Sequence, residues 1–291
     1  MLNLGISLII PSHKGRNKLP NCLNSVFAQD INPQLLELVI IVNGENDGTL
    51  ELIEQIKTHR HNFNFIIFHT QQASVSNARN IGIALATREY IVFLDDDDRI
   101  SPSYLSSLYA LAAPNTLVLA QLVNLSVDSQ PSIVKTITDK FPSFIYKFII
   151  KARVLTMNAC KLIPKEIIQC FKFDTTLRSS EDMAMFSALL ISKKMKIKVV
   201  DTHKRAIYFR TVGQSSVSRQ PISYDFNIRQ RLMVIRSIYS NVTPKVKLLT
   251  PQNLLFFTSR IIGELIYSLR VIFTGIRQKI KFSTQRKKHE S

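Results

Sequence analysis

Four consecutive aspartates, Asp95, Asp96, Asp97 and Asp98, directly follow an apolar run at residues 90–94 that is typical of a buried strand. Neighbouring carboxylates repel one another, and an uncompensated buried carboxylate costs several kcal/mol. A divalent cation relieves that repulsion. Mg²⁺ and Mn²⁺ prefer oxygen ligands, and a site of one or two carboxylates leaves positions for water and phosphate oxygens. The row predicts a metal site for a phosphorylated ligand; the alternative is a solvated acidic turn before a helix.

Glu181 and Asp182 form a second acidic pair, at the start of a helical apolar pattern that runs to residue 191. A positioned carboxylate is a general base for the proton of an attacking hydroxyl group. Adjacent side chains on a helix point about 100° apart, so only one of the two faces such a site. Alternatively, both residues only complement the helix dipole in the first turn, after Ser179 or Ser180 as the N-cap.

Two further polar clusters, residues 12–16 and 43–47, also come directly after apolar runs. Strand-like runs alternate with helix-like stretches, which predicts an α/β fold with a mostly parallel sheet. In open sheets of this kind ligands bind beyond the carboxyl ends of the strands, so the three clusters are expected to meet at one edge. The expected strands are 6–10, 38–42, 63–68 and 90–94, and the expected helices are 19–27, 50–56 and 78–86.

The second half of the chain has weaker patterns. Helices are expected at 104–112 and 181–191 and strands at 117–122 and 197–200, with an irregular segment between them. We expect this half to complete the sheet and to form the face that binds an acceptor. From residue 225 the chain is predicted to be helical and basic, with helices at 228–239 and 254–280.

Several stretches, in order, resemble glycosyltransferase family 2, whose members share the nucleotide-sugar-binding GT-A fold. The likeness covers roughly residues 4–220, and its most specific part is the D-x-D element followed by the Glu-Asp pair. The stretches are ISLIIPSH at 6–13, LVIIVNGENDGT at 38–49, SNARNIG at 76–82, YIVFLDDDD at 90–98, FD at 173–174 with SEDM at 180–183, and YFR at 208–210 with SSVSR at 215–219.

The resemblance implies a role for each matching residue. Asp97 ligates Mn²⁺ or Mg²⁺, with Asp98 as a second candidate ligand, and Asp182 is the catalytic base, with Glu181 as second choice. Asp95 lies by the ribose and Arg79 neutralises the diphosphate, although Arg79 could instead only pair with an aspartate at the sheet edge. The implied donor-binding residues are Pro11, Ser12, His13, Asn43, Arg79, Asp95 and Asp96.

The chain departs from the family pattern at two places. Val42 and Asn43 occupy positions where a pair of aspartates often stands, so the identity of the base in the donor stays open. Ala73 stands where a glycine is common. His203 is either a further metal ligand or, as for most single histidines, a structural residue.

The expected organisation is a GT-A catalytic domain at 1–224 and a basic amphipathic helical extension at 225–291. Within the first, 1–102 is the nucleotide-sugar half and 103–224 the acceptor half. The charge is also unevenly placed along the chain: residues 1–130 carry a net charge of −4 and residues 131–291 carry +21. A basic surplus of that size attracts a polyanion or an anionic membrane leaflet.

The apolar stretch at 254–273 contains Arg260, Glu264 and Arg270, which makes a membrane-spanning helix an unfavourable interpretation. Its apolar residues fall on one helical face and a basic tail follows, which predicts peripheral contact with an anionic membrane through 254–288. The alternative is packing on protein. Three cysteines without C-x-x-C spacing and the lack of a signal-like amino terminus lead us to expect a cytoplasmic location, peripheral at the inner face of the cell membrane.

The function expected is a metal-dependent hexosyltransferase that moves a sugar from a nucleotide-diphosphate donor to a hydroxyl of a glycan or lipid-linked glycan, in surface polysaccharide synthesis. Inversion at the anomeric carbon is the usual outcome in the family. Two other classes remain open, a metal-dependent nucleotidyltransferase and a non-catalytic basic scaffold that binds a membrane or a polyanion. Nucleic acid is not an expected partner, because the basic half lacks the aromatic and glycine motifs of RNA-binding modules.

Overall fold

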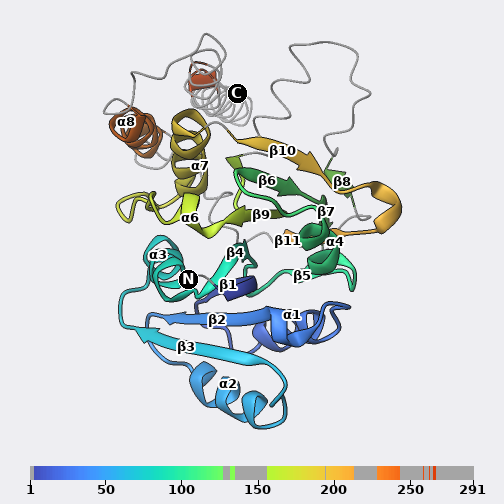
Figure 1. Cartoon of the computed structure of the whole chain (residues 1–291). Helices are drawn as coiled ribbons and strands as arrows, with labels where there is room; N and C mark the ends of the chain where they lie inside the picture. Colours follow the sequence, from blue (N-terminus) through green and yellow to red (C-terminus); the bar gives the residue numbers. More distant parts are fainter. Residues whose placement is uncertain are drawn as a thin grey trace, which may run out of the picture.

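The computed structural model describes residues 3–126, 132–134, 156–193, 195–212 and 228–242, together with Thr258, Ile262, Leu265 and Ile266. Within these residues the elements form two sheets with helices packed on both faces of the larger one (Figure 1). The larger sheet has seven strands in the order β10-β6-β9-β4-β1-β2-β3, and the smaller has four in the order β5-β11-β7-β8.

The first half follows the predicted alternation of strand and helix. β1, β2, β3 and β4 pair in parallel, so their carboxyl ends lie at one edge of the sheet. Most boundaries lie within a few residues of those expected, and β1 extends through Pro11 and Ser12. The elements are β1 (Asn3–Ser12), α1 (Leu19–Phe27), η1 (Pro33–Leu35), β2 (Leu36–Asn43), α2 (Thr49–Thr58), β3 (Asn64–Thr70), α3 (Val75–Leu85) and β4 (Arg88–Phe93).

The second half completes the large sheet and builds the small one. β9 is antiparallel to both β4 and β6, and β10 is parallel to β6, so the large sheet is mixed but mostly parallel. The elements are β5 (Arg99–Ile100), α4 (Tyr104–Ala110), β6 (Thr116–Leu119), β7 (Gln121–Ser126), β8 (Ser132–Val134), β9 (Lys161–Pro164), α6 (Lys165–Ile168), α7 (Glu181–Ser192), β10 (Lys196–Val199), η2 (Thr202–Lys204), β11 (Ile207–Val212) and α8 (Gln230–Val242).

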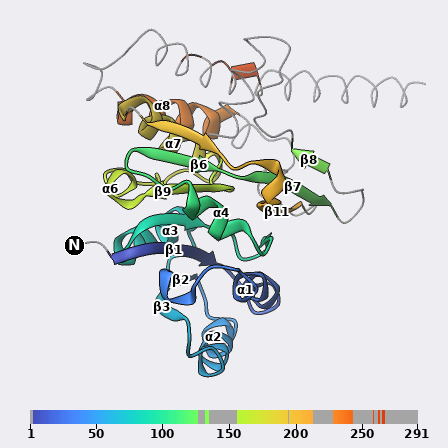
Figure 2. The same cartoon turned by 45° about the vertical axis from the view of Figure 1, so that its right-hand side comes forward.

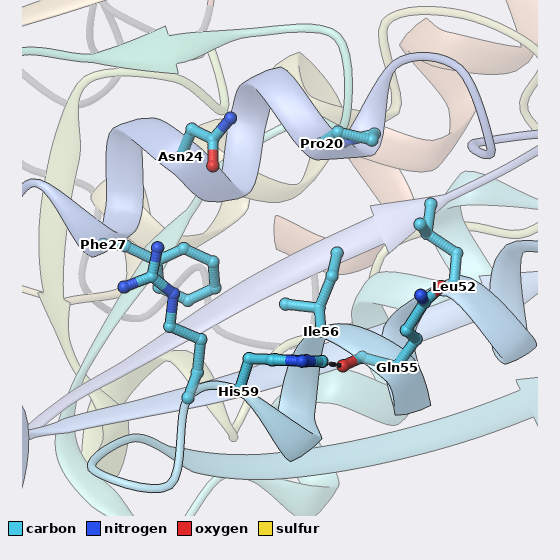
Figure 3. Close-up of a pocket in the computed structure, with 8 residues that line it drawn as sticks. Pro20, Asn24, Phe27, Leu52, Gln55, Ile56 and His59 are labelled. Carbon is cyan, nitrogen blue, oxygen red and sulfur yellow. Dashed lines mark hydrogen bonds between the residues drawn. The ribbon is translucent and has the colours of Figure 1, made fainter.

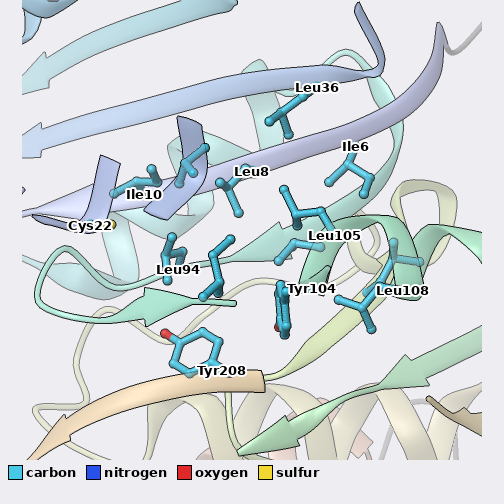
Figure 4. Close-up of a cluster of buried hydrophobic side chains, with 14 of the residues drawn as sticks. Ile6, Leu8, Ile10, Cys22, Leu36, Leu94, Tyr104, Leu105, Leu108 and Tyr208 are labelled. Carbon is cyan, nitrogen blue, oxygen red and sulfur yellow. The ribbon is translucent and has the colours of Figure 1, made fainter. Parts of the chain in front are cut away.

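Alternate residues of the central strands enter two separate hydrophobic cores, because successive side chains of a strand point to opposite faces. Leu8 and Ile10 of β1 pack with α1, α2 and α4 (Figure 4), whereas Ile9 between them packs with α3, α6, α7 and α8. α7 and α8 lie side by side over the sheet (Figures 1 and 2), with Phe186 and Val234 fully buried. The chain thus has a three-layer core, which fixes the strand ends that carry the polar clusters.

The expected strand at 117–122 was wrong as a single element. The chain leaves the large sheet at Ala120, so β6 pairs with β9 and β10 while β7 pairs with β11 and β8. The segment expected to be irregular contains β9, a strand in the middle of the large sheet.

Part of the predicted carboxyl-terminal organisation lies outside the described residues, including 213–227 and most of 254–288. The helix expected at 228–239 is α8, which lies within the range predicted for the extension and packs into the same core as α7. Thr258, Ile262, Leu265 and Ile266 are helical. In the part of the chain that the structure describes, no helix is both long and apolar enough to cross a membrane.

Candidate functional site

The three polar clusters meet at the carboxyl edge of the sheet, where Asp96 anchors the loop after β1. The Oδ2 atom of Asp96 accepts hydrogen bonds from Ser12 Oγ at 2.8 Å and from the His13 amide at 3.2 Å. Lys18 Nζ lies 3.1 Å from Oδ1. Because Asp96 is buried and both of its oxygens are engaged, it holds the loop between β1 and α1 in place.

Gly15 leaves room for the hydrogen bond between Ser12 and Asp96. A Cβ atom at this position would lie 1.9 Å from Ser12 Oγ and 3.1 Å from Asp96 Oδ2. Any larger residue therefore has to displace Ser12 from its hydrogen bond with Asp96.

The end of β2 is tied to the same loop. Asn43 Nδ2 donates to Ser12 O at 3.0 Å, and His13 Nδ1 lies 2.7 Å from Asn43 O. Asn43 is buried, and its side-chain amide joins the end of β2 to the end of β1. No group in the described residues donates a hydrogen bond to Asn43 Oδ1. The hydrogen bond from Asn43 Nδ2 to Ser12 O fixes the orientation of this oxygen.

Arg79 of α3 connects the aspartate row to α7. Its Nη2 atom lies 2.9 Å from Asp95 Oδ1, and its Nη1 atom lies 2.8 Å from Glu181 Oε1. The guanidinium also lies over the Phe173 ring, 5.4 Å from its centroid. Burial alone would lower the pKa of Arg79, but Asp95 and Glu181 outweigh burial and raise it above its usual value. Arg79 therefore stays charged and holds two carboxylates from different parts of the chain at one site.

Asp97 and Asp98 differ in burial and in hydrogen-bond partners. Asp98 is buried, and its carboxylate accepts from Tyr208 Oη at 2.7 Å and from the Thr211 amide at 2.7 Å, both on β11. Asp97 is exposed, and no other residue in the described part of the chain donates to its carboxylate.

Asp97 and Asp98 also differ in what raises the pKa of each carboxyl group. Partial desolvation, then Asp95 and Asp96, raise the pKa of Asp97. Burial, then Asp95 and Asp97, raise the pKa of Asp98 to about 8. A cation close to the exposed Asp97 would therefore relieve the repulsion within the row, whereas Asp98 is already satisfied by protein donors.

These residues fit a divalent cation that is shared with a ligand. No group of three or more His, Cys, Asp and Glu side chains among the described residues forms a cage for a metal ion. One open carboxylate, Asp97, leaves most coordination positions to water and phosphate oxygens, which is usual for Mg²⁺. His203 is exposed, lies near Asp201, and makes no contact with the row in the described residues.

Asp182 lies at the start of α7, beside Glu181. Its Oδ2 atom accepts a hydrogen bond from the Asn158 amide at 3.1 Å, and its Oδ1 atom accepts from the Met183 amide at 2.7 Å. Burial, then the charge of Glu181, raise the pKa of Asp182 to about 6, although Arg79 acts against this. A carboxylate with that pKa is mostly ionised at neutral pH and still able to take up a proton.

α8 supports this end of α7. Ser180, immediately before α7, has a left-handed backbone with φ of 60°, and its Oγ atom accepts from Arg231 Nη1 at 2.6 Å. Gln230 Oε1 accepts from the Arg178 amide at 3.1 Å. The turn that presents Glu181 and Asp182 is thus held from α8.

A groove of about 350 Å³ lies elsewhere, between α1 and α2 (Figure 3). Phe27 and Ile56 supply much of its apolar lining, and Arg60 lies over the Phe27 ring. None of the predicted site residues lines this groove, so it is separate from the carboxylate edge.

The model of the family described as "Glycosyl transferase family 2" matches residues 7–169, more than half of the chain. The chain belongs to glycosyl transferase family 2. The aspartate row and β9 lie inside the matched range, and Glu181 and Asp182 lie beyond it.

Relatives at the sequence level are glycosyltransferases. An uncharacterized glycosyltransferase of Haemophilus influenzae is 29% identical over 248 residues, which cover 80% of this chain and 92% of that protein. The poly(ribitol-phosphate) beta-N-acetylglucosaminyltransferase TarP of Staphylococcus aureus is 26% identical over 192 residues, 65% of this chain and 58% of TarP.

Solved structures have the same fold. TarS residues 1–349 of S. aureus, in complex with UDP-GlcNAc, superpose with a TM-score of 0.70 at 19% identity, covering 90% of this chain and 72% of that one. A mannosyltransferase of Pyrobaculum calidifontis with GDP-Man and Mn²⁺ has a TM-score of 0.63 at 13% identity, covering 95% of this chain and 79% of that one. The expected GT-A fold and glycosyltransferase class are confirmed.

Three residues of this family 2 site were not predicted. Lys18, Tyr208 and Thr211 bind the aspartate row, and Tyr208 Oη also accepts from the Asp95 amide at 3.2 Å. The stretch YFR at 208–210 contributes to the family resemblance, but nothing in the sequence indicates that β11 lies beside residues more than a hundred positions earlier.

Proposed function

We propose that this glycosyltransferase moves a sugar from a nucleoside-diphosphate donor to a hydroxyl group of a cell-surface glycan or of a lipid-linked glycan. The observation that carries the proposal is the ion pairing of Arg79 with both Asp95 and Glu181. Through it, the aspartate row at the donor edge and the acidic start of α7 form one site. Two similar proteins support this substrate class: TarP is a poly(ribitol-phosphate) beta-N-acetylglucosaminyltransferase, and TarS forms a complex with UDP-GlcNAc.

Asp182 is the general base in this proposal. Glu181 is already engaged in an ion pair with the buried guanidinium of Arg79. Asp182 accepts only backbone amides in the described residues, and its pKa of about 6 suits a base that works near neutral pH. Asp182 takes the proton of the acceptor hydroxyl while that oxygen attacks the anomeric carbon, with inversion.

Asp97 is the metal ligand in this proposal, with Mn²⁺ or Mg²⁺ as the ion. Asp97 is exposed and unpartnered in the described residues, whereas both donors from β11 already occupy Asp98. When bound, a divalent cation neutralises charge that develops on the departing diphosphate. Asp95, held by Arg79, is left to contact the ribose.

Arg79 acts as a positioning residue rather than as a diphosphate ligand. Both of its terminal nitrogens bind carboxylates, and only 5% of its side chain is exposed. Ser12, His13, Asn43 and Asp96 keep the donor loop in shape, and Pro11 lies in the strand end below them.

We further propose that the enzyme is cytoplasmic and docks peripherally on the inner face of the membrane, close to a lipid-linked acceptor. Ile262, Leu265 and Ile266 are helical, spaced to share one face, and 45 to 48% exposed. A strongly basic sequence follows them. Apolar contact and attraction to anionic lipids would act together.

Donor binding by a panel of nucleotide sugars tests the proposal. Isothermal titration of UDP- and GDP-sugars is run with Mn²⁺, Mg²⁺ or EDTA on the wild type, on Asp97→Asn and on Asp98→Asn. We expect one donor to bind only with metal, with loss in Asp97→Asn and retention in Asp98→Asn. Absence of binding by the folded wild type to every donor would favour a scaffold.

A further inference from the structure

Lys161 is a charged residue with no exposed surface, at the start of a strand in the middle of the large sheet. It pairs with Leu119 of β6, and its Nζ atom lies 4.0 Å from the centroid of the Phe186 ring on α7. Burying an ammonium group costs several kcal/mol, and an apolar residue of similar volume at such a position is often more stable. The sheet therefore retains a group that core packing alone does not explain.

The ammonium group donates a hydrogen bond to the carbonyl oxygen of Met157. The amide of the next residue, Asn158, donates to Asp182 Oδ2 at 3.1 Å. This carbonyl and this amide are the two ends of one planar peptide group. Lys161 and Asp182 are therefore joined through a single peptide unit, with the cation at the oxygen end and the carboxylate at the nitrogen end.

A cation at the oxygen of a peptide group polarises it and makes its N–H a stronger donor, because linked hydrogen bonds reinforce one another where the dielectric is low. A stronger donor stabilises the ionised form of the carboxylate that accepts from it. The same bond fixes the orientation of the peptide, and so fixes where Asp182 is held.

We propose that Lys161 is a positioning residue of the catalytic centre, which orients Asp182 and strengthens its ionised form through the Met157–Asn158 peptide. The inference rests on the proposed role of Asp182 as the base, but the connection itself can be tested without activity. Lys161 does not contact the reacting atoms in this account.

The titratable groups around this unit come from several parts of the chain. Arg79 of α3 and Glu181 of α7 act on Asp182, Cys160 and Asp182 act on Lys161, and Arg210 of β11 acts on Cys160. Burial lowers the pKa of Lys161 to about 8, with Cys160 and Asp182 opposing it, and burial raises the pKa of Cys160 to about 11. Near neutral pH the thiol is neutral and Lys161 is mostly charged, so Lys161 is the cation on this side of Asp182.

The test follows the ¹H–¹⁵N signal of the Asn158 amide during a pH titration of the wild type, Lys161→Met and Lys165→Met. Lys165 is the matched control, because its Nζ atom donates to the carbonyl of Ala86, away from Asp182. We expect the wild-type signal to titrate with Asp182, near pH 6. In Lys161→Met the midpoint should rise by roughly one pH unit and the proton signal should move upfield, with Lys165→Met unchanged. An Asn158 titration that is the same in Lys161→Met and the wild type would overturn the proposal.

Kinetic measurements distinguish the proposed role of Lys161 from the proposed role of Asp182 as the base. In Lys161→Met the kcat of transfer should fall about twofold at pH 7 and about tenfold at pH 5, because the acidic limb should move with the amide midpoint, and the donor KM and thermal stability should be kept. If the amide midpoint moves while the pH–rate profile does not, the peptide connection holds and Asp182 is not the base. Lys161→Gln, which keeps an N–H donor without the charge, replaces the Met variant if that variant does not fold, and the same shift in direction is expected.

Discussion

At the scale of single residues, neighbouring acidic residues of the site have different surroundings. Asp98 is closed off by Tyr208 and Thr211, whereas Asp97 is open to solvent. Glu181 is bound by Arg79, whereas Asp182 accepts backbone amides. On these surroundings rests our proposal that Asp97 binds the metal and Asp182 takes up the proton.

The pKa of Asp182 predicts how activity depends on pH. Burial and Glu181 raise this pKa to about 6, and only the ionised form accepts a proton. We expect kcat/KM for transfer to be level above about pH 7 and to fall about tenfold per pH unit below 6. Initial rates between pH 5 and 9 with Glu181→Gln as control measure this; removal of the Glu181 charge should move the limb to lower pH. A profile without an acidic limb down to pH 5 would contradict the prediction.

Sequence patterns select these residues, but their ranking, Asp97 before Asp98 and Asp182 before Glu181, rests on the family resemblance alone. Residue type does not distinguish Asp97 from Asp98 in a row of four, because β11, which binds Asp98, is more than a hundred residues away. Arg79 was expected to bind the diphosphate, with pairing to an aspartate as the alternative, and the two ion pairs of its buried guanidinium correspond to that alternative.

At the scale of elements, the loop between β1 and α1 depends on the close approach of Gly15 to Ser12. In Gly15→Ala, Ser12 must leave Asp96 and a buried carboxylate loses a donor. We expect a loss of about 1–3 kcal/mol in the free energy of unfolding and a higher donor KM. Ser12→Ala removes the same hydrogen bond without adding atoms, and chemical denaturation should show a smaller loss. Full stability in Gly15→Ala would refute this account of the loop.

The first half of the fold was predictable because its strands are continuous apolar runs separated by polar turns. The second half was not. β9 contains a buried lysine, which hides its strand pattern, and the run at 117–122 contains no breaker at Ala120, where the chain changes sheet. Both β9 and the change of sheet at Ala120 depend on pairing between strands that are far apart in the sequence, which local hydrophobic periodicity does not indicate.

At the scale of the whole molecule, the basic surplus lies in the second half of the chain, and the described residues Ile262, Leu265 and Ile266 expose apolar surface. We expect the full chain to float with vesicles that contain phosphatidylglycerol, to dissociate at high salt, and to ignore pure phosphatidylcholine vesicles. Replacement of the three residues by serine should abolish flotation. Leu232→Ser, an exposed apolar position on α8, is the control. Equal binding by the triple variant would contradict membrane docking through this face.

The two halves of the molecule meet at the proposed catalytic centre, where α3 and the aspartate row of the first half join α7 of the second. The most direct test compares sugar transfer and donor binding in Asp182→Asn and Glu181→Gln with the wild type, at saturating donor and metal. Because a general base contributes about 10²–10⁴ in rate, kcat should fall at least a hundredfold in Asp182→Asn, with the Kd of the donor within about threefold of the wild type. Transfer by Asp182→Asn at a rate close to that of the wild type would contradict the account.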